Sequence, residues 1–178
     1  MKLYGFPPTR SIRVLWTLRE LDVEFEFVNV DPTKGELRRP EFLAVNPAGK
    51  LPVLVDGDFI LTESVAIVLY LAEKYPEKGL LPSGLRARAE VNRWLLFSAT
   101  ELEQPLWRIA RHTSLYPPEK RLAAEIPIAR HDFLDMAAVL EKYMLLDTLP
   151  RLREFMERMY KRPNAPPRIA EAFASLRR

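Results

Sequence analysis

The chain has 178 residues, of which 48% are hydrophobic and 29% are charged, and its formal net charge is +3 at pH 7. This composition is typical of a globular protein and excludes a disordered chain. Lysines and arginines are dispersed among acidic residues, so we expect no nucleic-acid partner. The longest uncharged apolar run, Val65 to Ala72, is too short to cross a membrane.

The sequence contains no cysteine and two histidines, His112 and His131. The lack of cysteine excludes disulfides, thiolate metal sites and a cysteine nucleophile. Each histidine lies on a helical pattern without a partner histidine, so we expect solvated or interfacial side chains and no metal site. The sequence opens directly in an expected strand, from which we expect no signal peptide and a cytoplasmic location.

The first part of the sequence alternates between strand and helix patterns. Ser11 is the expected N-cap of the first helix, whose apolar residues include Ile12, Leu15 and Trp16. An Asp-Gly turn follows the third strand. We expect strands at 2–6, 25–30, 51–55 and 59–62, and helices at 11–21, 35–42 and 63–75. The order is therefore βαβαββα.

The last helix of this part is expected to begin after Thr62, a suitable N-cap, with Glu63 in its first turn. Its free N–H groups and its dipole favour a carboxylate near Glu63 and Ser64. The helix repeats apolar residues at i, i+3, i+4 and i+7. The expected buried face consists of Val65, Val68, Leu69 and Ala72.

The second part of the sequence shows only helical patterns. A proline- and glycine-rich stretch separates it from the first part and marks a linker, placed at 77–85. We expect helices at 86–112 (bent at Pro105), 119–143 and 149–161, and a short one beginning near Pro166 or Pro167. The predicted division is an α/β domain at 1–76 and a helical domain at 86–178.

The third strand contains a proline, within the motif VNPAGKLPVL at 45–54. Proline lacks an N–H group and is normally excluded from central strands. The motif LTESVAIVLYLAEKYP follows at 61–76, and SIRVLWTLREL precedes at 11–21. Together these motifs resemble the thioredoxin-like N-terminal domain of glutathione S-transferases, and the helical second part resembles their C-terminal helical bundle more loosely.

The resemblance implies glutathione as co-substrate, no metal, and a set of binding residues. It implies a cis peptide bond before Pro52, which turns the backbone of Leu51 outward to pair with glutathione. Glu63 and Ser64 would hold the γ-glutamyl end, and Lys50 the glycyl carboxylate. Taken without the family, these are an edge-strand proline, two residues at a helix start and a solvated lysine.

The thiol-activating group of the family is commonly a hydroxyl in the turn after the first strand. The commonest serine position falls near Pro8, which has no donor. Thr9 and Ser11 flank it and are the candidate catalytic residues, although Ser11 also suits the N-cap role. Tyr4 is expected to pack. Cysteine-type members of the family are excluded by composition.

An acceptor pocket for a small electrophile is expected from Phe6, Trp107, Arg111 and Tyr116, with core packing as the alternative for each. A helix that the family usually has is expected to be missing near 144–150. The resemblance implies a cytoplasmic, homodimeric transferase with a role in detoxification. The alternatives are a non-catalytic glutathione-binding or protein-interaction member of the fold and a glutathione-dependent disulfide reductase or isomerase.

Overall fold

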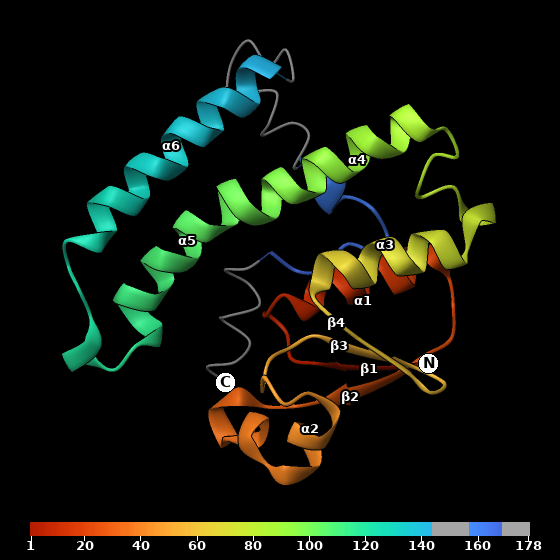
Figure 1. Cartoon of the computed structure of the whole chain (residues 1–178), viewed down its shortest axis with the longest axis horizontal. Helices are drawn as coiled ribbons and strands as arrows, with labels where there is room; N and C mark the ends of the chain where they lie inside the picture. Colours follow the sequence, from red (N-terminus) through yellow and green to blue (C-terminus); the bar gives the residue numbers. More distant parts are fainter. Residues whose placement is uncertain (144–156, 169–178) are drawn as a thin grey trace. The chain divides into compact units, whose positions relative to one another are not determined.

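The structure is a computed structural model that describes residues 1–143 and 157–168. It divides into two compact units, one made of Met1–Pro82 with Met159–Arg178 and one made of Ser83–Arg158 (Figure 1). The division falls inside the expected linker at 77–85. Among the described residues, no helix is long and apolar enough to cross a membrane.

A mixed four-stranded sheet forms the centre of the first unit, in the order β2-β1-β3-β4. β1 pairs in parallel with β2, and β3 pairs antiparallel with both β1 and β4. The strands are β1 (Lys2–Gly5), β2 (Glu26–Asn29), β3 (Val53–Asp56) and β4 (Phe59–Thr62). The expected order βαβαββα is confirmed.

Helices cover both faces of this sheet (Figure 1). α1 (Ser11–Leu21) and α3 (Ser64–Lys74) pack side by side on one face. The core under them consists of Leu3, Val14, Leu18, Leu21, Leu54, Ile67 and Leu71. On the other face, a smaller core of Val30, Phe42 and Val53 involves α2 (Pro40–Val45). The expected thioredoxin-like fold is therefore confirmed.

The segment before α2 differs from the expected helix at 35–42. It contains short 3-10 turns at Pro32–Lys34 and Glu36–Arg38, and α2 begins only at Pro40. Gly35 ends the first turn with φ of 69°, a left-handed conformation that glycine adopts at little cost. Pro40 suits the first turn of α2 because that turn needs no N–H donor there.

The expected N-caps of α1 and α3 were wrong, and the expected buried face of α3 was partly wrong. Arg10 and Glu63 occupy the N-cap positions, in place of Ser11 and Thr62. The buried residues are Ser11, Val14, Leu18 and Leu21 in α1, and Ser64, Ile67, Leu71 and Ala72 in α3. Apolar residues occur on nearly every side of α3, so their spacing alone does not identify the buried side.

The second unit contains α4 (Leu85–Phe97), α5 (Glu103–Ala110) and α6 (Glu125–Tyr143), with α6 beginning later than the expected residue 119. A π-helical turn at Ser98–Leu102 separates α4 from α5. Pro105 lies inside α5, shortly after this turn, and its nitrogen has no hydrogen to donate to the helical ladder. The bend expected at Pro105 stays a prediction. Arg108 joins α5 to α6 through Glu125 (2.9 Å) and Asp132 (2.6 Å).

A segment near the C-terminus contacts α1 in the first unit. The Arg162 Nε donates to the Glu20 carboxylate at 3.0 Å, and the Asn164 amide donates to the Arg19 carbonyl at 3.0 Å. The bond from Arg162 holds the pKa of Glu20 below its ordinary value. Residues 159–168 therefore group with the first unit, whereas the expected division assigned them to the helical domain.

Residues 157–160 are helical, within the expected helix at 149–161. The rest of that prediction up to residue 156, and the missing helix near 144–150, lie outside the described residues. The expected last helix, beginning near Pro166 or Pro167, lies mostly outside them as well.

Asp56 ties the end of β3 to α3. Its carboxylate accepts a hydrogen bond from the Tyr70 hydroxyl at 2.6 Å and pairs with the Lys74 ammonium. The bond from Lys74, followed by the one from Tyr70, holds the pKa of Asp56 below its ordinary value. A carboxyl with a lowered pKa stabilises the fold above its unfolded pKa, and this stabilisation is lost as pH falls through the folded pKa.

We predict that Asp56→Asn lowers the free energy of unfolding by about 1 to 2 kcal/mol at neutral pH, because the charged hydrogen bonds are lost. The difference from the parent protein should shrink as the pH falls through the folded pKa of Asp56, because the carboxyl then becomes protonated in both states. Denaturant unfolding at neutral pH and over a series of acidic pH values measures it. Asp58→Asn, at an exposed aspartate of the same turn, is the control. Equal losses in the two variants would contradict the prediction.

Candidate functional site

Several predicted site residues lie at one end of the sheet, as the strand register requires. Tyr4 of β1 pairs with Val53 of β3, and Val53 pairs in turn with Thr62 of β4. The residues following β1, preceding β3 and following β4 therefore leave the sheet at the same end. This brings together the turn at 6–10, the turn at 46–52 and the start of α3.

The two candidate hydroxyls, Thr9 and Ser11, bond to each other. Their oxygens are 2.7 Å apart, and the Ser11 N–H also points to the Thr9 hydroxyl at 3.3 Å. The Ser11 hydroxyl accepts a hydrogen bond from the Phe6 N–H at 3.2 Å. Ser11 is fully buried, whereas Thr9 is partly exposed. Ser11 is thus an internal partner of Thr9 and not the N-cap expected from the sequence.

Gly5 allows α1 to begin this close to β1. A β-carbon on Gly5 would lie 2.9 Å from the Ser11 Cβ and 3.1 Å from its hydroxyl oxygen. Ordinary carbon contacts are near 3.5 Å or longer, so the serine occupies space that any larger residue would need. The position of the Ser11 hydroxyl therefore depends on the absence of a side chain at Gly5.

A buried asparagine organises the turn before Pro52. The Asn46 amide donates to the Lys50 carbonyl at 2.8 Å, and its oxygen accepts from the Ala48 N–H at 3.1 Å. The Leu51–Pro52 peptide bond is cis, as the family resemblance implied. Pro52 precedes the first residue of β3, so the proline interrupts no pairing of that strand. Lys50 is exposed at the same turn.

The start of α3 carries several features suited to an anion. Ser64 is its first residue and is buried, and Glu63 is the exposed N-cap, whose side chain makes no capping bond within the described structure. The N–H groups of a first helical turn have no intrahelical acceptor, and the helix dipole adds partial positive charge. Arg13 of α1 donates to the Ser64 hydroxyl at 3.3 Å, which brings a full positive charge to this helix end.

Sequence reasoning missed two arginines near these turns. Arg13 was treated only as part of the α1 motif, although it reaches Ser64 across 51 residues of sequence. The Arg38 guanidinium lies beside Gly49, 3.1 Å from where a β-carbon on that glycine would stand. Gly49 immediately precedes Lys50, so Arg38 and Lys50 place two cations beside one turn. In the sequence, the adjacent arginines at 38–39 and the Gly-Lys pair at 49–50 could have indicated this positive charge.

The expected acceptor-pocket residues belong to both units. Phe6 lies in the first unit, in the turn after β1, while the other three residues lie in the second. There, the Arg111 guanidinium stacks over the Tyr116 ring at 5.2 Å, and Trp107 is an exposed residue of α5. Their assembly into one acceptor pocket stays a prediction.

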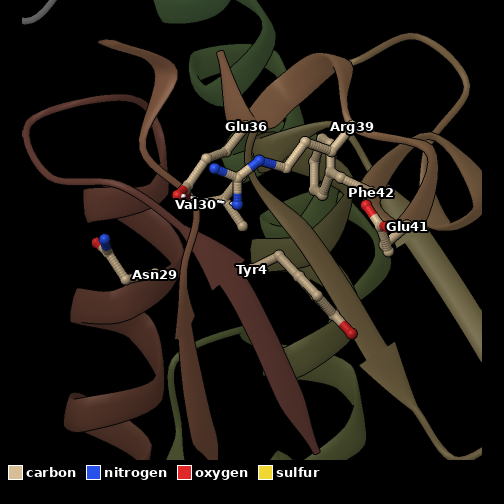
Figure 2. A pocket seen from close by; sticks show the side chains of 7 residues that line it. All are labelled: Tyr4, Asn29, Val30, Glu36, Arg39, Glu41 and Phe42. Carbon is tan, nitrogen blue, oxygen red and sulfur yellow. Dashed lines mark ion pairs between the residues drawn. The ribbon is translucent and has the colours of Figure 1, made fainter. Parts of the chain in front are cut away.

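A separate hollow of about 340 Å³ lies on the α2 face of the sheet (Figure 2). Tyr4 and Phe42 form its aromatic part, with ring centroids 6.2 Å apart, and Arg39 pairs there with Glu36 at 3.3 Å. Of the expected site residues, none is among those that line it in the described structure. Tyr4 also packs against the core of Val30, Phe42 and Val53, which is the packing role expected for it.

Of the two histidines, His112 differs from the expected solvated or interfacial side chain. His112 is buried, accepts a hydrogen bond from the Leu122 N–H at 3.1 Å, and packs edge-on against Tyr116. His131 is exposed and lies near Asp135 at 3.5 Å. Within the part of the chain that the structure describes, no group of three or more His, Cys, Asp or Glu residues is placed to hold a metal ion.

The sheet, its helices and the turns at its end define a protein of the thioredoxin-like class followed by a helical unit. Residues 1–73 match the family model described as the glutathione S-transferase N-terminal domain. The chain is 42% identical over 135 residues to glutathione S-transferase F10 of Arabidopsis thaliana, covering 75% of this chain and 62% of that protein. It is 40% identical over 111 residues to human glutathione S-transferase theta-1, and this match covers 62% of this chain and 45% of that protein.

Solved structures agree with these relatives. Human glutathione S-transferase T1-1 in its apo form is 33% identical, with a TM-score of 0.70, over 79% of this chain and 61% of that one. Glutathione transferase F7 of Populus trichocarpa is 26% identical, with a TM-score of 0.80, over 96% of this chain and 98% of that chain. The chain thus contains a glutathione S-transferase N-terminal domain at residues 1–73 and resembles members of that family over most of its length. It spans less than two thirds of the length of the curated relatives named above.

We predict that Gly5→Ala lowers the free energy of unfolding by about 1 to 3 kcal/mol, because the new methyl group overpacks Ser11. Gly84→Ala is the matched control, since Gly84 has a φ of −74° and open space around it. The control should change stability by less than about 0.5 kcal/mol. Denaturant unfolding measures both variants, and a harmless Gly5→Ala would contradict the described contact.

Proposed function

We propose that the protein is a glutathione transferase, which binds glutathione at the end of the sheet and activates its thiol for attack on a small electrophile. The observation that carries this proposal is the meeting of the turn at 6–10, the turn at 46–52 and the start of α3. A thiol tripeptide needs a hydroxyl for its sulfur, a backbone segment to pair with and a helix N-terminus for a carboxylate, and these turns and this helix would supply them. The curated relatives named as glutathione S-transferases support the same activity.

The charges of glutathione match the charges at this sheet end. We assign the γ-glutamyl carboxylate to the start of α3, where Ser64 and Arg13 supply a hydroxyl and a positive charge. The exposed carboxylate of Glu63 is assigned to the ligand's ammonium group. The glycyl carboxylate is assigned to Lys50, with Arg38 as a second cation beside the same turn.

The middle of the ligand is assigned to Leu51. Its N–H and C=O groups precede β3, whose ladder to β1 begins at Val53. They would pair with the cysteinyl backbone as an added strand does. The thiol of that residue would then point toward the turn at 6–10, which carries the Thr9 hydroxyl.

The proposed reaction begins when the glutathione thiol releases its proton to solvent, leaving a thiolate that a hydroxyl donor stabilises. The thiolate sulfur forms a bond to the electrophilic carbon with its own electron pair. The leaving group, a halide for an aromatic halide, departs with the electron pair of the broken bond.

We also propose a homodimer, as the family resemblance implies, and a role in detoxification in the cytoplasm. The cytoplasm holds reduced glutathione. The protein has no cysteine, so it has no thiol of its own that could exchange with that glutathione. The molecular mass of the protein in solution, measured by light scattering or sedimentation, distinguishes a monomer from a dimer.

We predict that retention on immobilised glutathione falls at least about tenfold in the double variant Glu63→Ala with Ser64→Ala, because charged hydrogen bonds to the γ-glutamyl end are lost. Ser83→Ala, at an exposed serine outside the site, should keep full retention. Titration calorimetry with free glutathione gives the same comparison in solution. Unchanged binding in the double variant would reject the assigned site.

We predict turnover of an aromatic halide with glutathione by the parent protein. Conjugate formation followed by absorbance measures it, and a small disulfide replaces the halide in a parallel assay. Binding without either turnover would identify a non-catalytic glutathione-binding member of the fold. Turnover of the disulfide alone would identify a glutathione-dependent reductase.

A further inference from the structure

We propose that the hollow on the α2 face of the sheet is a second ligand site, which binds an organic ammonium ion carrying an aromatic group (Figure 2). Its volume of about 340 Å³ lies at the lower end of the range for small-molecule sites, roughly 300 to 1,000 Å³. No residue assigned to glutathione is among those that line it in the described structure. The site therefore goes beyond glutathione binding and does not require it.

Two aromatic rings form the apolar wall of this hollow. Tyr4 and Phe42 lie with their ring centroids 6.2 Å apart and their planes at 51° to each other, and the buried Val30 packs with them. Tyr4 is half-buried, so part of its ring stays accessible. Among the described residues, no lysine or arginine stacks on either ring. Because the face of an aromatic ring attracts a cation, this wall suits both the apolar body and the charge of an organic ammonium ion.

Negative charge exceeds positive charge around the hollow. Of the described residues that line it, Glu36 and Glu41 are acidic and Arg39 is the single cation. Arg39 pairs with Glu36 at 3.3 Å, and the other Glu36 oxygen accepts from the Asp31 N–H at 2.7 Å. Figure 2 shows the Arg39 guanidinium turned toward Glu36, with Glu41 away from both. The exposed Glu41 carboxylate makes no ion pair or hydrogen bond in the described structure, so it is open to a ligand cation.

A neutral acceptor completes the lining. The Asn29 side chain is exposed at the end of β2 and makes no hydrogen bond among the described residues. Its amide oxygen accepts hydrogen bonds, and an ammonium group has N–H groups to donate. An anionic ligand would meet the opposite conditions, because the charge of Arg39 is already balanced by Glu36 and Glu41 would repel a second carboxylate. The hollow therefore favours a cation over an anion of the same shape.

Titration calorimetry with 2-phenylethylammonium tests the site, and 3-phenylpropionate is the matched anionic probe because it has the same ring and chain length. The variants are Glu41→Gln, which removes the open carboxylate, and Arg39→Gln, which removes the cation of the lining. Glu24→Gln is the control, because Glu24 is an exposed glutamate of the same unit outside the hollow. Each titration is repeated with saturating glutathione, and thermal unfolding reports whether each variant is folded.

We expect the parent protein to bind 2-phenylethylammonium at least about fivefold more tightly than 3-phenylpropionate, with or without glutathione. Glu41→Gln should weaken binding of the ammonium probe by roughly threefold to fivefold, as expected for the loss of an exposed ion pair. Arg39→Gln should strengthen it by roughly twofold to fivefold, because a repelling charge is removed and Glu36 is released. A gain of affinity cannot arise from a damaged fold. Glu24→Gln should match the parent protein.

Other outcomes overturn the ammonium site. A parent protein that does not bind the ammonium probe at millimolar concentrations, or that binds both probes equally, has no such site. Equal weakening in Glu41→Gln and Glu24→Gln would show attraction by general surface charge, and weaker binding in Arg39→Gln would contradict the assigned charges. Displacement of the probe by glutathione would place it in the glutathione site and leave the transferase proposal standing. Failure of glutathione binding with unchanged ammonium binding would reject the transferase proposal alone.

Discussion

The candidate site depends on the close approach of α1 to the end of β1. Gly5 has no side chain, so the first residue of α1 packs directly over the strand and the Ser11 hydroxyl reaches the Phe6 N–H. This contact determines where the turn at 6–10 runs and where Thr9 emerges. It also sets the direction of α1, whose first turn carries Arg13 to the start of α3. One short backbone-to-helix distance thus positions both the hydroxyl and the cation.

Positive charge at this end of the sheet lies at two separate positions. The start of α3 combines a helix dipole with the guanidinium of Arg13, while Lys50 and Arg38 lie by the preceding turn. Asn46 holds that turn through its own side-chain bonds and is buried while doing so. A ligand with a carboxylate at each end matches this separation of charge. The central strands supply the rigid frame that keeps the two places apart.

The sequence predicted the elements of the first unit well because their signals are local. Pro52 marked the start of β3, and Glu63 with Ser64 marked the start of α3, since prolines and helix starts have strong local preferences. The buried faces were less predictable. α3 is apolar on most sides, so only its neighbours α1 and the sheet decide that Ile67 faces inward.

The sequence by itself determined the order of elements, the three motifs and the candidate hydroxyls, all of which depend on residue type and spacing along the chain. Tertiary structure alone decided that Ser11 is buried and bonded to Thr9, because an N-cap serine and a buried serine have the same local sequence. It likewise decided that Arg13 meets Ser64. Contacts between residues far apart in the chain arise from strand register and helix packing, which spacing along one segment does not encode.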